Sequence, residues 1–394
     1  MKYVDICEFW SPEGGGVKTY VEARWRAAHA AGHHVDVIAP SARDHVTTVE
    51  GGSLIEVRAP TLFVDPRYHI FWSRKPVEDA LRRCNPDLIE ASSPWRALSL
   101  AAEYPASLPR TLFMHEEPVL KYPYRWFDWF VPRKVIDRLL VPWFWHRLKK
   151  YYARYDALVF AAPSIARRLN DAGVMNTVTI PMGVDAGIFS PRNRDERLRA
   201  DLLARMGLPE SATLIIAIGR LVSEKRWPTI INAFQSVSAT AEVGLIALGG
   251  GYTSARVAKR IGDDPHIMQM SPIANRAEYA RTIASADMFF HASNAETFGL
   301  AAAEALASGL PMVIPDEGAV IDQADPAYSE TYPAADSEAA ARTIHAMIAR
   351  LPAARQAAAR KAAAPRTLDQ HFTDLFADYE HRIAAHGRGP CHSR

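Results

Sequence analysis

Short apolar runs alternate with helical patterns along nearly the whole chain. In the first half, runs of four to eight residues read as buried strands, and a helical pattern covers residues 17–31 between the first two runs. Strands that alternate with helices in this way are typical of parallel βαβ units, so the pattern predicts an α/β fold. The expected strands of this half are residues 2–7, 34–39, 87–91, 110–115, 157–162 and 177–182.

The same pattern starts again near residue 213. Between the two halves, residues 183–212 are rich in Gly, Pro, Asp and Arg, a composition that indicates a linker with one short helix. The sequence therefore predicts two doubly wound, Rossmann-like parallel sheets with a boundary near residue 187. The expected strands of the second half are residues 213–219, 243–249, 266–270, 288–292 and 311–315.

The last part of the chain, residues 337–386, is rich in alanine and helical in pattern. Its final helix places large apolar side chains on one face, which must pack against another element. We therefore expect an N-terminal domain of residues 1–186, a second domain of residues 187–365, and a helix in residues 366–394 that returns to the N-terminal domain. The apolar side chains of that face are Leu368, Phe372, Leu375, Phe376 and Tyr379.

Composition excludes several classes of protein. The 394 residues are 48% hydrophobic and 23% charged, as in soluble globular proteins, and the net charge of +2 is too small for a general nucleic-acid binder. The cysteines Cys7, Cys84 and Cys391 form no C-x-x-C pair, which argues against a disulfide framework or a cysteine-rich zinc site. The sequence shows neither the apolar core of a signal peptide nor about 18 consecutive apolar residues, so it predicts a cytoplasmic protein that does not span the membrane.

Three glycines, at positions 14–16, stand just before the first helical pattern. Glycines at a helix N-terminus let backbone N–H groups approach an anion closely. Thr19 breaks the G-x-G-x-x-G pattern of dinucleotide-binding folds, and Val17 breaks the P-loop pattern, so NAD and ATP are disfavoured. The alternative for this segment is a flexible turn.

Two cations follow the first strand of the second half. Arg220 and Lys225 lie five residues apart where the sheet is expected to open. A guanidinium and an ammonium in such a place suit a diphosphate, the first by its fork and the second as a point charge. A solvated charged surface is the alternative interpretation.

Glu296 and Glu304 flank a predicted strand-to-helix junction. The amides of Phe298, Gly299 and Leu300 would form the N-terminus of that helix. Carboxylates accept hydrogen bonds from sugar and ribose hydroxyls, whereas the helix end attracts phosphate. A nucleotide-sugar satisfies both requirements.

These motifs together resemble glycosyltransferase family 4, whose members are retaining enzymes of the GT-B fold, with two Rossmann-like domains facing a cleft. The resemblance rests on the N-terminal GGG, GRLVSEK, LGGG, the Glu-x7-Glu of ETFGLAAAE, ALASGLP, and GVDAGIFSP between the halves. It is strongest from residue 213 to residue 315. Two departures are the DEGAV loop, with Glu317 and Gly318 where a glycine pair is usual, and the unusual spacing of residues 322–336.

The resemblance implies roles for the donor-domain residues. Arg220 and Lys225 would hold the donor diphosphate, Glu304 would bind the ribose hydroxyls, and Glu296 would bind the hydroxyls of the transferred sugar. The amides of Phe298, Gly299 and Leu300 would meet the phosphate and the sugar.

The first half supplies the remaining implied site residues. Gly15 and Gly16 would close over the donor from the acceptor domain. His115 matches the family's histidine near the transferred sugar, although a lone histidine is more often structural. His115 also forms an H-x-E pair with Glu117, but the P-C-x-x-C partner of zinc deaminases is absent, so no metal is predicted.

Residues 121–155 are rich in aromatic and basic side chains, with nine Lys or Arg against two Asp. Such a segment favours an anionic membrane surface. Single-stranded nucleic acid is a competing partner, and aromatic packing inside the N-terminal domain is a further alternative.

The function predicted from the sequence is transfer of a hexose from a nucleoside diphosphate sugar to a hydroxyl of a membrane lipid or lipid-linked glycan. A UDP-sugar is favoured as donor, with GDP-mannose as the alternative. We expect a peripheral enzyme on the inner face of the cell membrane that needs no metal or cofactor and binds no nucleic acid. Open alternatives are a nucleotide-sugar epimerase, a transferase with a soluble or polysaccharide acceptor, and a non-enzymatic protein that binds anionic lipid or nucleic acid.

Overall fold

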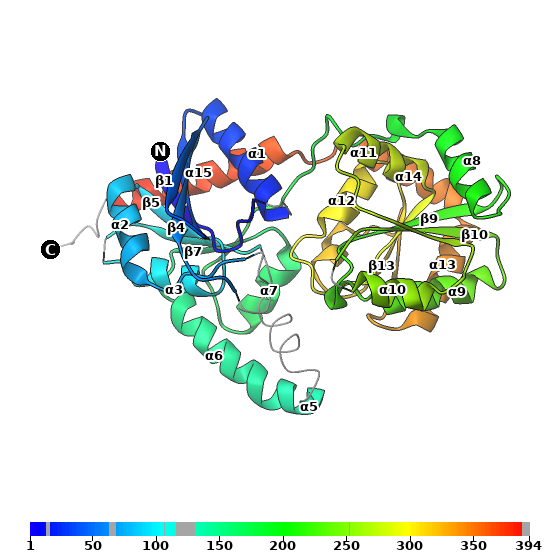
Figure 1. Ribbon diagram of the computed structural model, residues 1–394, viewed down its shortest axis with the longest axis horizontal. Helices are drawn as coiled ribbons and strands as arrows, with labels where there is room; N and C mark the ends of the chain where they lie inside the picture. Colours follow the sequence, from blue (N-terminus) through cyan, green and yellow to red (C-terminus); the bar gives the residue numbers. More distant parts are fainter. Residues whose placement is uncertain (13–15, 63–67, 106, 116–130, 252, 388–394) are drawn as a thin grey trace. The chain divides into compact units, whose positions relative to one another are not determined.

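The chain divides into two compact units (Figure 1). The structure is a computed structural model that describes residues 1–12, 16–62, 68–105, 107–115, 131–251 and 253–387. Unit 1 is Met1–Pro181 with the chain from Leu368 onward, and unit 2 is Met182–Thr367. The division follows Pro181 rather than falling near residue 187, because the N–H of Val184 donates to the carbonyl of Arg366 at 2.9 Å. The segments by which the chain enters and leaves unit 2 are therefore hydrogen-bonded to each other through their backbones.

Unit 1 is built on an eight-stranded sheet in the order β3-β4-β2-β1-β5-β6-β7-β8. All neighbouring strands are parallel except β3 and β4, which pair antiparallel at one edge. Tyr3 of the central β1 lies opposite Val35 of β2 and Leu88 of β5. The strands are β1 (Lys2–Ile6), β2 (His34–Ser41), β3 (His45–Val49), β4 (Gly52–Arg58), β5 (Leu88–Ala91), β6 (Arg110–Phe113), β7 (Ala157–Phe160) and β8 (Thr177–Thr179).

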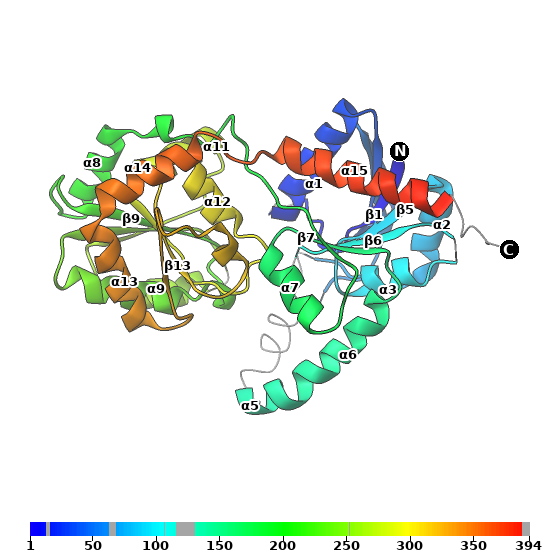
Figure 2. The same ribbon diagram turned by 180° about the vertical axis from the view of Figure 1, so that it is seen from behind.

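Helices cover both faces of this sheet. The helices α1 and α15 contact each other on one face, and α2, α3, α6 and α7 lie on the other (Figures 1 and 2). A π-helical turn, Ile136–Leu140, joins α5 to α6. The helices are α1 (Gly16–Ala30), α2 (Arg74–Cys84), α3 (Arg96–Ala102), α5 (Arg133–Val135), α6 (Val141–Tyr152), α7 (Pro163–Asp171) and α15 (Leu368–Gly387).

A buried charge cluster fixes α15 to unit 1. Arg24 of α1 is fully buried and donates to Glu90 and Asp5, both at 2.5 Å, at the centre of the sheet. Tyr379 of α15 donates its hydroxyl to the second oxygen of Glu90. Because a buried charge is costly without partners, these contacts tie α15 to a defined position on the sheet.

Unit 2 contains a six-stranded, fully parallel sheet in the order β11-β10-β9-β12-β13-β14. Its four inner strands are largely apolar segments packed between two helical layers, with α9, α10 and α13 on one face and α11, α12 and α14 on the other (Figure 1). The strands are β9 (Thr213–Ile218), β10 (Val243–Leu248), β11 (Ile267–Met270), β12 (Met288–Phe290), β13 (Met312–Pro315) and β14 (Ser329–Tyr332). The α-helices are α8 (Glu196–Arg205), α9 (Trp227–Ser238), α10 (Ser254–Ile261), α11 (Arg276–Ser285), α12 (Leu300–Ala307), α13 (Ser337–Ala349) and α14 (Leu351–Ala362). Shorter 3-10 turns are η2 (Pro191–Asn193), η3 (Ser223–Lys225) and η4 (Ala319–Gln323).

The predicted pair of largely parallel α/β sheets is confirmed. The strands β3, β4 and β14 were not expected from the sequence, and the helical pattern of residues 337–386 consists of three separate helices. In the described part of the chain, no helix is long and apolar enough to cross a bilayer.

Candidate functional site

The candidate site lies at the carboxyl edge of the unit 2 sheet, where the loops after β9 and β10 touch. A Cβ at Gly249 would lie 1.9 Å from the carbonyl oxygen of Gly219, and one at Gly251 would lie 2.5 Å from that of Leu221. Leu221 also exchanges backbone hydrogen bonds with this loop, because its N–H donates to Gly250. The glycines of LGGG therefore allow the close approach that fixes the loop carrying Arg220.

Arg220 and Lys225 both lie on this loop, with Lys225 at the end of η3. The indole of the buried Trp227 donates to the carbonyl of Arg220 at 2.9 Å, which anchors the backbone of the loop. The Arg220 side chain is 56% exposed and lies 3.5 Å from Glu224, whereas that of Lys225 is 21% exposed. Arg220 is thus open to a ligand, and Lys225 is largely held by the protein.

Lys225 is held by Glu296, which lies in the loop between β12 and α12. The ammonium of Lys225 donates to Oε1 of Glu296, and Nε2 of His291 lies 3.3 Å from the same oxygen. Burial raises the pKa of Glu296, but the charge of Lys225 and the neighbouring His291 lower it more, so the net pKa lies well below its usual range. Glu296 is therefore a carboxylate at every physiological pH.

The loop after Glu296 ends at the N-terminus of α12. Gly299 precedes this helix with φ 83°, a left-handed conformation that suits glycine, and Gln323 donates to the carbonyls of Phe298 and Gly299. The N–H groups of Phe298, Gly299 and Leu300 donate no hydrogen bond to any other part of the described chain. Unpaired N–H groups at a helix N-terminus favour an anion.

Glu304 lies one turn further along α12 and is 4% exposed. Arg276 donates to its Oε1 at 3.0 Å, and the hydroxyl of Tyr279 donates to its Oε2 at 2.8 Å. Burial raises the pKa of Glu304, and these two donors offset only part of that effect. Each carboxylate oxygen keeps further acceptor capacity, so hydroxyl groups of a ligand can still bind.

The DEGAV loop after β13 supports the same edge. Gly318 has φ 84°, and a Cβ there would lie 2.4 Å from the carbonyl oxygen of Asn294. The side chain of Asn294 donates to Glu317 at 3.0 Å. The single glycine thus allows this loop to lie against the Glu296 loop.

The site residues expected from the first half lie in unit 1. His115 follows β6, with its ring centroid 4.9 Å from that of Tyr20 and 4.8 Å from that of Phe113. Burial, together with the charges of Arg24 and His371, lowers the pKa of His115 to about 3, so its imidazole is neutral. Gly16 begins α1, and a Cβ there would meet nothing within 4 Å, whereas Gly15 lies outside the described residues.

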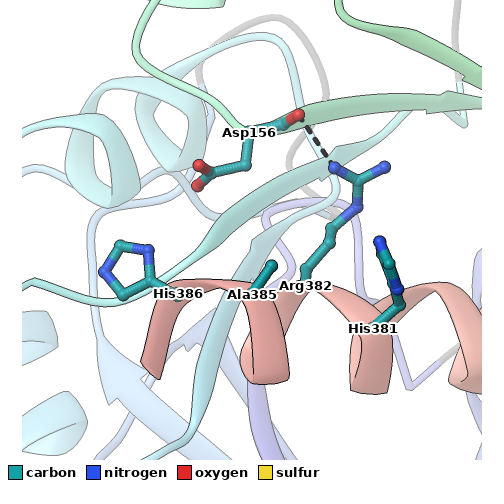
Figure 3. Close-up of a pocket in the computed structure, with 5 residues that line it drawn as sticks. All are labelled: Asp156, His381, Arg382, Ala385 and His386. Carbon is teal, nitrogen blue, oxygen red and sulfur yellow. Dashed lines mark hydrogen bonds between the residues drawn. The ribbon is translucent and has the colours of Figure 1, made fainter. Parts of the chain in front are cut away.

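A surface pocket of unit 1 lies apart from these residues. It forms along α15 beside Asp156, whose carbonyl accepts a hydrogen bond from Arg382 at 3.0 Å (Figure 3). None of the residues singled out in the sequence lines it. The described residues contain no group of three or more His, Cys, Asp or Glu side chains that could hold a metal ion.

Sequence reasoning missed three side chains of the unit 2 site. His291 reaches Glu296, and Arg276 and Tyr279 hold Glu304. His291 stands five residues before Glu296 in the same loop segment, which was a usable signal. Arg276 and Tyr279 come from α11, and no spacing pattern connects them with Glu304.

The site thus combines cations, a helix N-terminus and two buried carboxylates at one edge of a parallel sheet. Two family models match the chain: Glycosyltransferase Family 4 at residues 14–187 and Glycosyl transferases group 1 at residues 199–363. The fold and the matches define the protein as a glycosyltransferase of the GT-B class. The chain belongs to glycosyltransferase family 4, as its motifs indicate.

Curated relatives span most of the chain. It is 28% identical over 317 residues to the GDP-mannose-dependent alpha-(1-6)-phosphatidylinositol dimannoside mannosyltransferase of Mycobacterium tuberculosis, covering 80% of this chain and 79% of the relative. It is 27% identical over 334 residues to a GDP-mannose-dependent alpha-mannosyltransferase of Corynebacterium glutamicum, covering 82% and 74%.

Solved structures share the fold at low sequence identity. Sucrose-phosphate synthase from Thermosynechococcus elongatus has a TM-score of 0.76 at 17% identity, covering 98% of this chain and all of that one. The HepE protein of Anabaena in complex with UDP has a TM-score of 0.69 at 15% identity, covering 97% of this chain and 100% of that one.

Proposed function

We propose that this glycosyltransferase transfers mannose, with retention of configuration, from GDP-mannose to a hydroxyl of a membrane lipid or lipid-linked glycan. The observation that carries the proposal is the Lys225–Glu296 pair beside the unpaired amides of Phe298, Gly299 and Leu300. The choice of GDP-mannose over the UDP-sugar favoured by the sequence rests on the names of the mycobacterial and corynebacterial relatives.

The donor is held by charge and by hydroxyl contacts. Arg220 and Lys225 bind the diphosphate, and the N–H groups at the start of α12 bind its oxygens. Glu304 accepts hydrogen bonds from the ribose, and Glu296 accepts them from the mannose. In this arrangement the cations face the part of the donor on which negative charge grows.

In the reaction the bond between the sugar and the diphosphate breaks, and the acceptor hydroxyl attacks the same face of the sugar. The departing phosphate oxygen takes the hydroxyl proton, so the products are a mannoside and GDP. The protein stabilises the developing negative charge through Arg220, Lys225 and the helix end. A metal ion is unnecessary in this scheme, because those groups neutralise the diphosphate. Neutral His115 fits a hydrogen-bonding role toward the sugar.

A lipid acceptor is supported by the exposed surface of the α5–α6 segment, residues 133–152, which extends away from the unit 1 sheet (Figures 1 and 2). Val135, Leu139 and Trp143 recur every four residues along it and are 40%, 62% and 60% exposed. Exposed cations flank them, while the opposite side packs on unit 1 through Phe144 and other buried residues. The exposed flanking cations are Lys134, Arg138, Arg147, Lys149 and Lys150.

Apolar side chains beside cations suit the interface of an anionic bilayer. We therefore propose that the enzyme acts as a peripheral protein on the inner face of the cell membrane. Residues 121–130, which belong to the same basic and aromatic stretch, lie outside the described residues.

A donor and acceptor screen tests the function. Purified protein is incubated with GDP-mannose, UDP-glucose or UDP-galactose, with and without phosphatidylinositol or its mannosides, and both nucleotide release and products are measured. We expect GDP release that depends on lipid, together with a mannosylated lipid. Sugar epimerisation without an acceptor, transfer to soluble glycans alone, or turnover of UDP-sugars alone would overturn the proposal.

A further inference from the structure

His291 is a buried histidine of the unit 2 site, beside Glu296. It directly follows β12 and is 3% exposed. Its backbone is held on both sides, because its N–H donates to Val313 at 2.9 Å and its carbonyl accepts from the hydroxyl of Tyr332 at 2.6 Å. Its ring lies nearly parallel to that of Phe289, at 16°. The imidazole is therefore held in a fixed place.

The ring nitrogen Nε2 of His291 faces Glu296. It lies 3.3 Å from Oε1 of that carboxylate, yet it makes no hydrogen bond within the part of the chain that the structure describes. Buried polar atoms without a partner are rare, and each needs an explanation. Here the ammonium of Lys225 already donates to the same carboxylate oxygen.

Donor binding changes this balance. If Lys225 turns toward the diphosphate, as the proposed function requires, Glu296 loses this donor; in the structure its side chain is only 16% exposed. A buried carboxylate without a donor is costly and poorly oriented. Nε2 of His291, which lies 3.3 Å from Oε1 of Glu296, can then replace Lys225 as the donor.

We infer that His291 is a positioning residue, which donates a hydrogen bond from Nε2 to Glu296 when Lys225 engages the donor diphosphate. His291 then holds the carboxylate in the orientation that receives the sugar hydroxyls. This inference rests on the proposed function, because it assigns Glu296 to the sugar and Lys225 to the diphosphate. In this role His291 acts through Glu296 and not directly on the donor or the acceptor.

The test compares nucleotide and nucleotide-sugar binding in wild type and His291→Phe. The phenyl ring can keep the stacking on Phe289, and it lacks both ring nitrogens and therefore the N–H donor. Calorimetry gives the Kd of GDP and of GDP-mannose, and the ratio of the two reports the sugar contact without any acceptor. We expect the variant to weaken GDP-mannose binding about 10- to 100-fold more than GDP binding, the range for losing a hydrogen bond to a charged group.

Three further variants separate positioning from a structural effect. His291→Gln, which keeps an N–H donor, recovers most of the lost preference. In a Glu296→Gln background, His291→Phe adds no further change in the ratio, because the two residues act as one unit. His345→Phe, at an exposed histidine of α13, changes neither Kd.

The possible failures are distinguishable. An unchanged ratio in His291→Phe, or an additive change in the Glu296→Gln background, overturns the role of His291 while wild type still binds GDP-mannose. If wild type binds neither GDP-mannose nor UDP-glucose, the proposed function fails and takes the inference with it. If it binds only UDP-glucose, the assignment of GDP-mannose as donor fails. The ratio of the Kd values of UDP and UDP-glucose, compared between wild type and His291→Phe, then supports or overturns the role of His291.

Discussion

Charge reversal on the α5–α6 segment tests whether this surface docks on membranes. The variant replaces Lys134, Arg138, Lys149 and Lys150 by Glu, all four exposed in the structure. Each cation near an anionic surface contributes about 1 kcal/mol, so losing four weakens binding by about 4 kcal/mol, roughly a thousandfold, before the repulsion of the new carboxylates. We therefore expect complete loss of sedimentation with phosphatidylglycerol vesicles at low salt.

A second variant separates charge from apolar insertion. Leu139→Ser with Trp143→Ser removes two side chains that are 62% and 60% exposed. Inserting each contributes on the order of 1–2 kcal/mol, so this variant binds more weakly but keeps the salt dependence of wild type. Charge reversal removes the salt dependence as well, because the electrostatic part of binding is gone.

The matched control carries the same change in net charge elsewhere. Arg82 and Arg83 on α2, with Lys259 and Arg260 on α10, are exposed cations outside the segment, and all four are replaced by Glu. This control is expected to sediment like wild type. If the control and the α5–α6 variant lose binding equally, the attraction is a general effect of charge. If the α5–α6 variant binds as before, this surface is not the docking site, and the lipid acceptor loses its main structural support.

Four further predictions concern the donor site. Arg220→Ala and Lys225→Met are each expected to lower kcat about 100- to 1,000-fold, because each removes about 3–4 kcal/mol of transition-state stabilisation. A loss of kcat below about threefold in both variants would contradict the assignment of these two residues to the diphosphate. In Lys225→Met the pKa of Glu296 is expected to rise, because the ammonium no longer opposes the effect of burial. The fall of kcat at acidic pH should therefore begin at a higher pH than in wild type. If it does not move, Lys225 does not control the ionisation of Glu296. Glu304→Gln raises the KM for the donor, whereas Glu296→Gln lowers kcat, and identical kinetic effects would remove the distinction between ribose and sugar contacts. Turnover persists in excess EDTA, and a complete loss restored by added metal would show that the cations and the helix end do not neutralise the diphosphate unaided.

The fold could be predicted where strands are buried on both faces. The strands β9 and β10 are continuous apolar segments, and their neighbours in the sheet bury them completely or nearly so. The edge strand β3 escaped prediction because nearly all of its HVTTV residues are exposed, so it carries no apolar run. The strand β14, with the sequence SETY, is short and polar, and parallel pairing with β13 rather than its own composition stabilises it.

The parts of the candidate site that lie close together in the sequence could be predicted. Glu296 and Glu304 flank a strand-to-helix junction that is readable in the sequence, and the structure places one in the loop and the other on α12. The partners of these carboxylates were not predicted. Lys225 meets Glu296 across 71 positions, and Arg276 meets Glu304 across 28. Such pairs depend on the order of strands in the sheet, which brings distant loops to one edge.

The structure also shows that the two cations of the motif are not equivalent. Lys225 forms an ion pair with Glu296, so under the proposed function its move to the ground-state diphosphate exchanges one ion pair for another and adds little to donor binding; its effect on kcat would come from the charge that grows in the transition state. Arg220 is 56% exposed, and among the described residues its side chain makes only a long contact with Glu224, so it can bind phosphate at small cost. Under the proposed function Arg220 would therefore supply most of the attraction for the incoming donor. Under the proposed function Lys225 would couple donor binding to Glu296, because its move toward the phosphate would free the carboxylate for the sugar. Such a site would present the sugar-binding carboxylate when a diphosphate is bound.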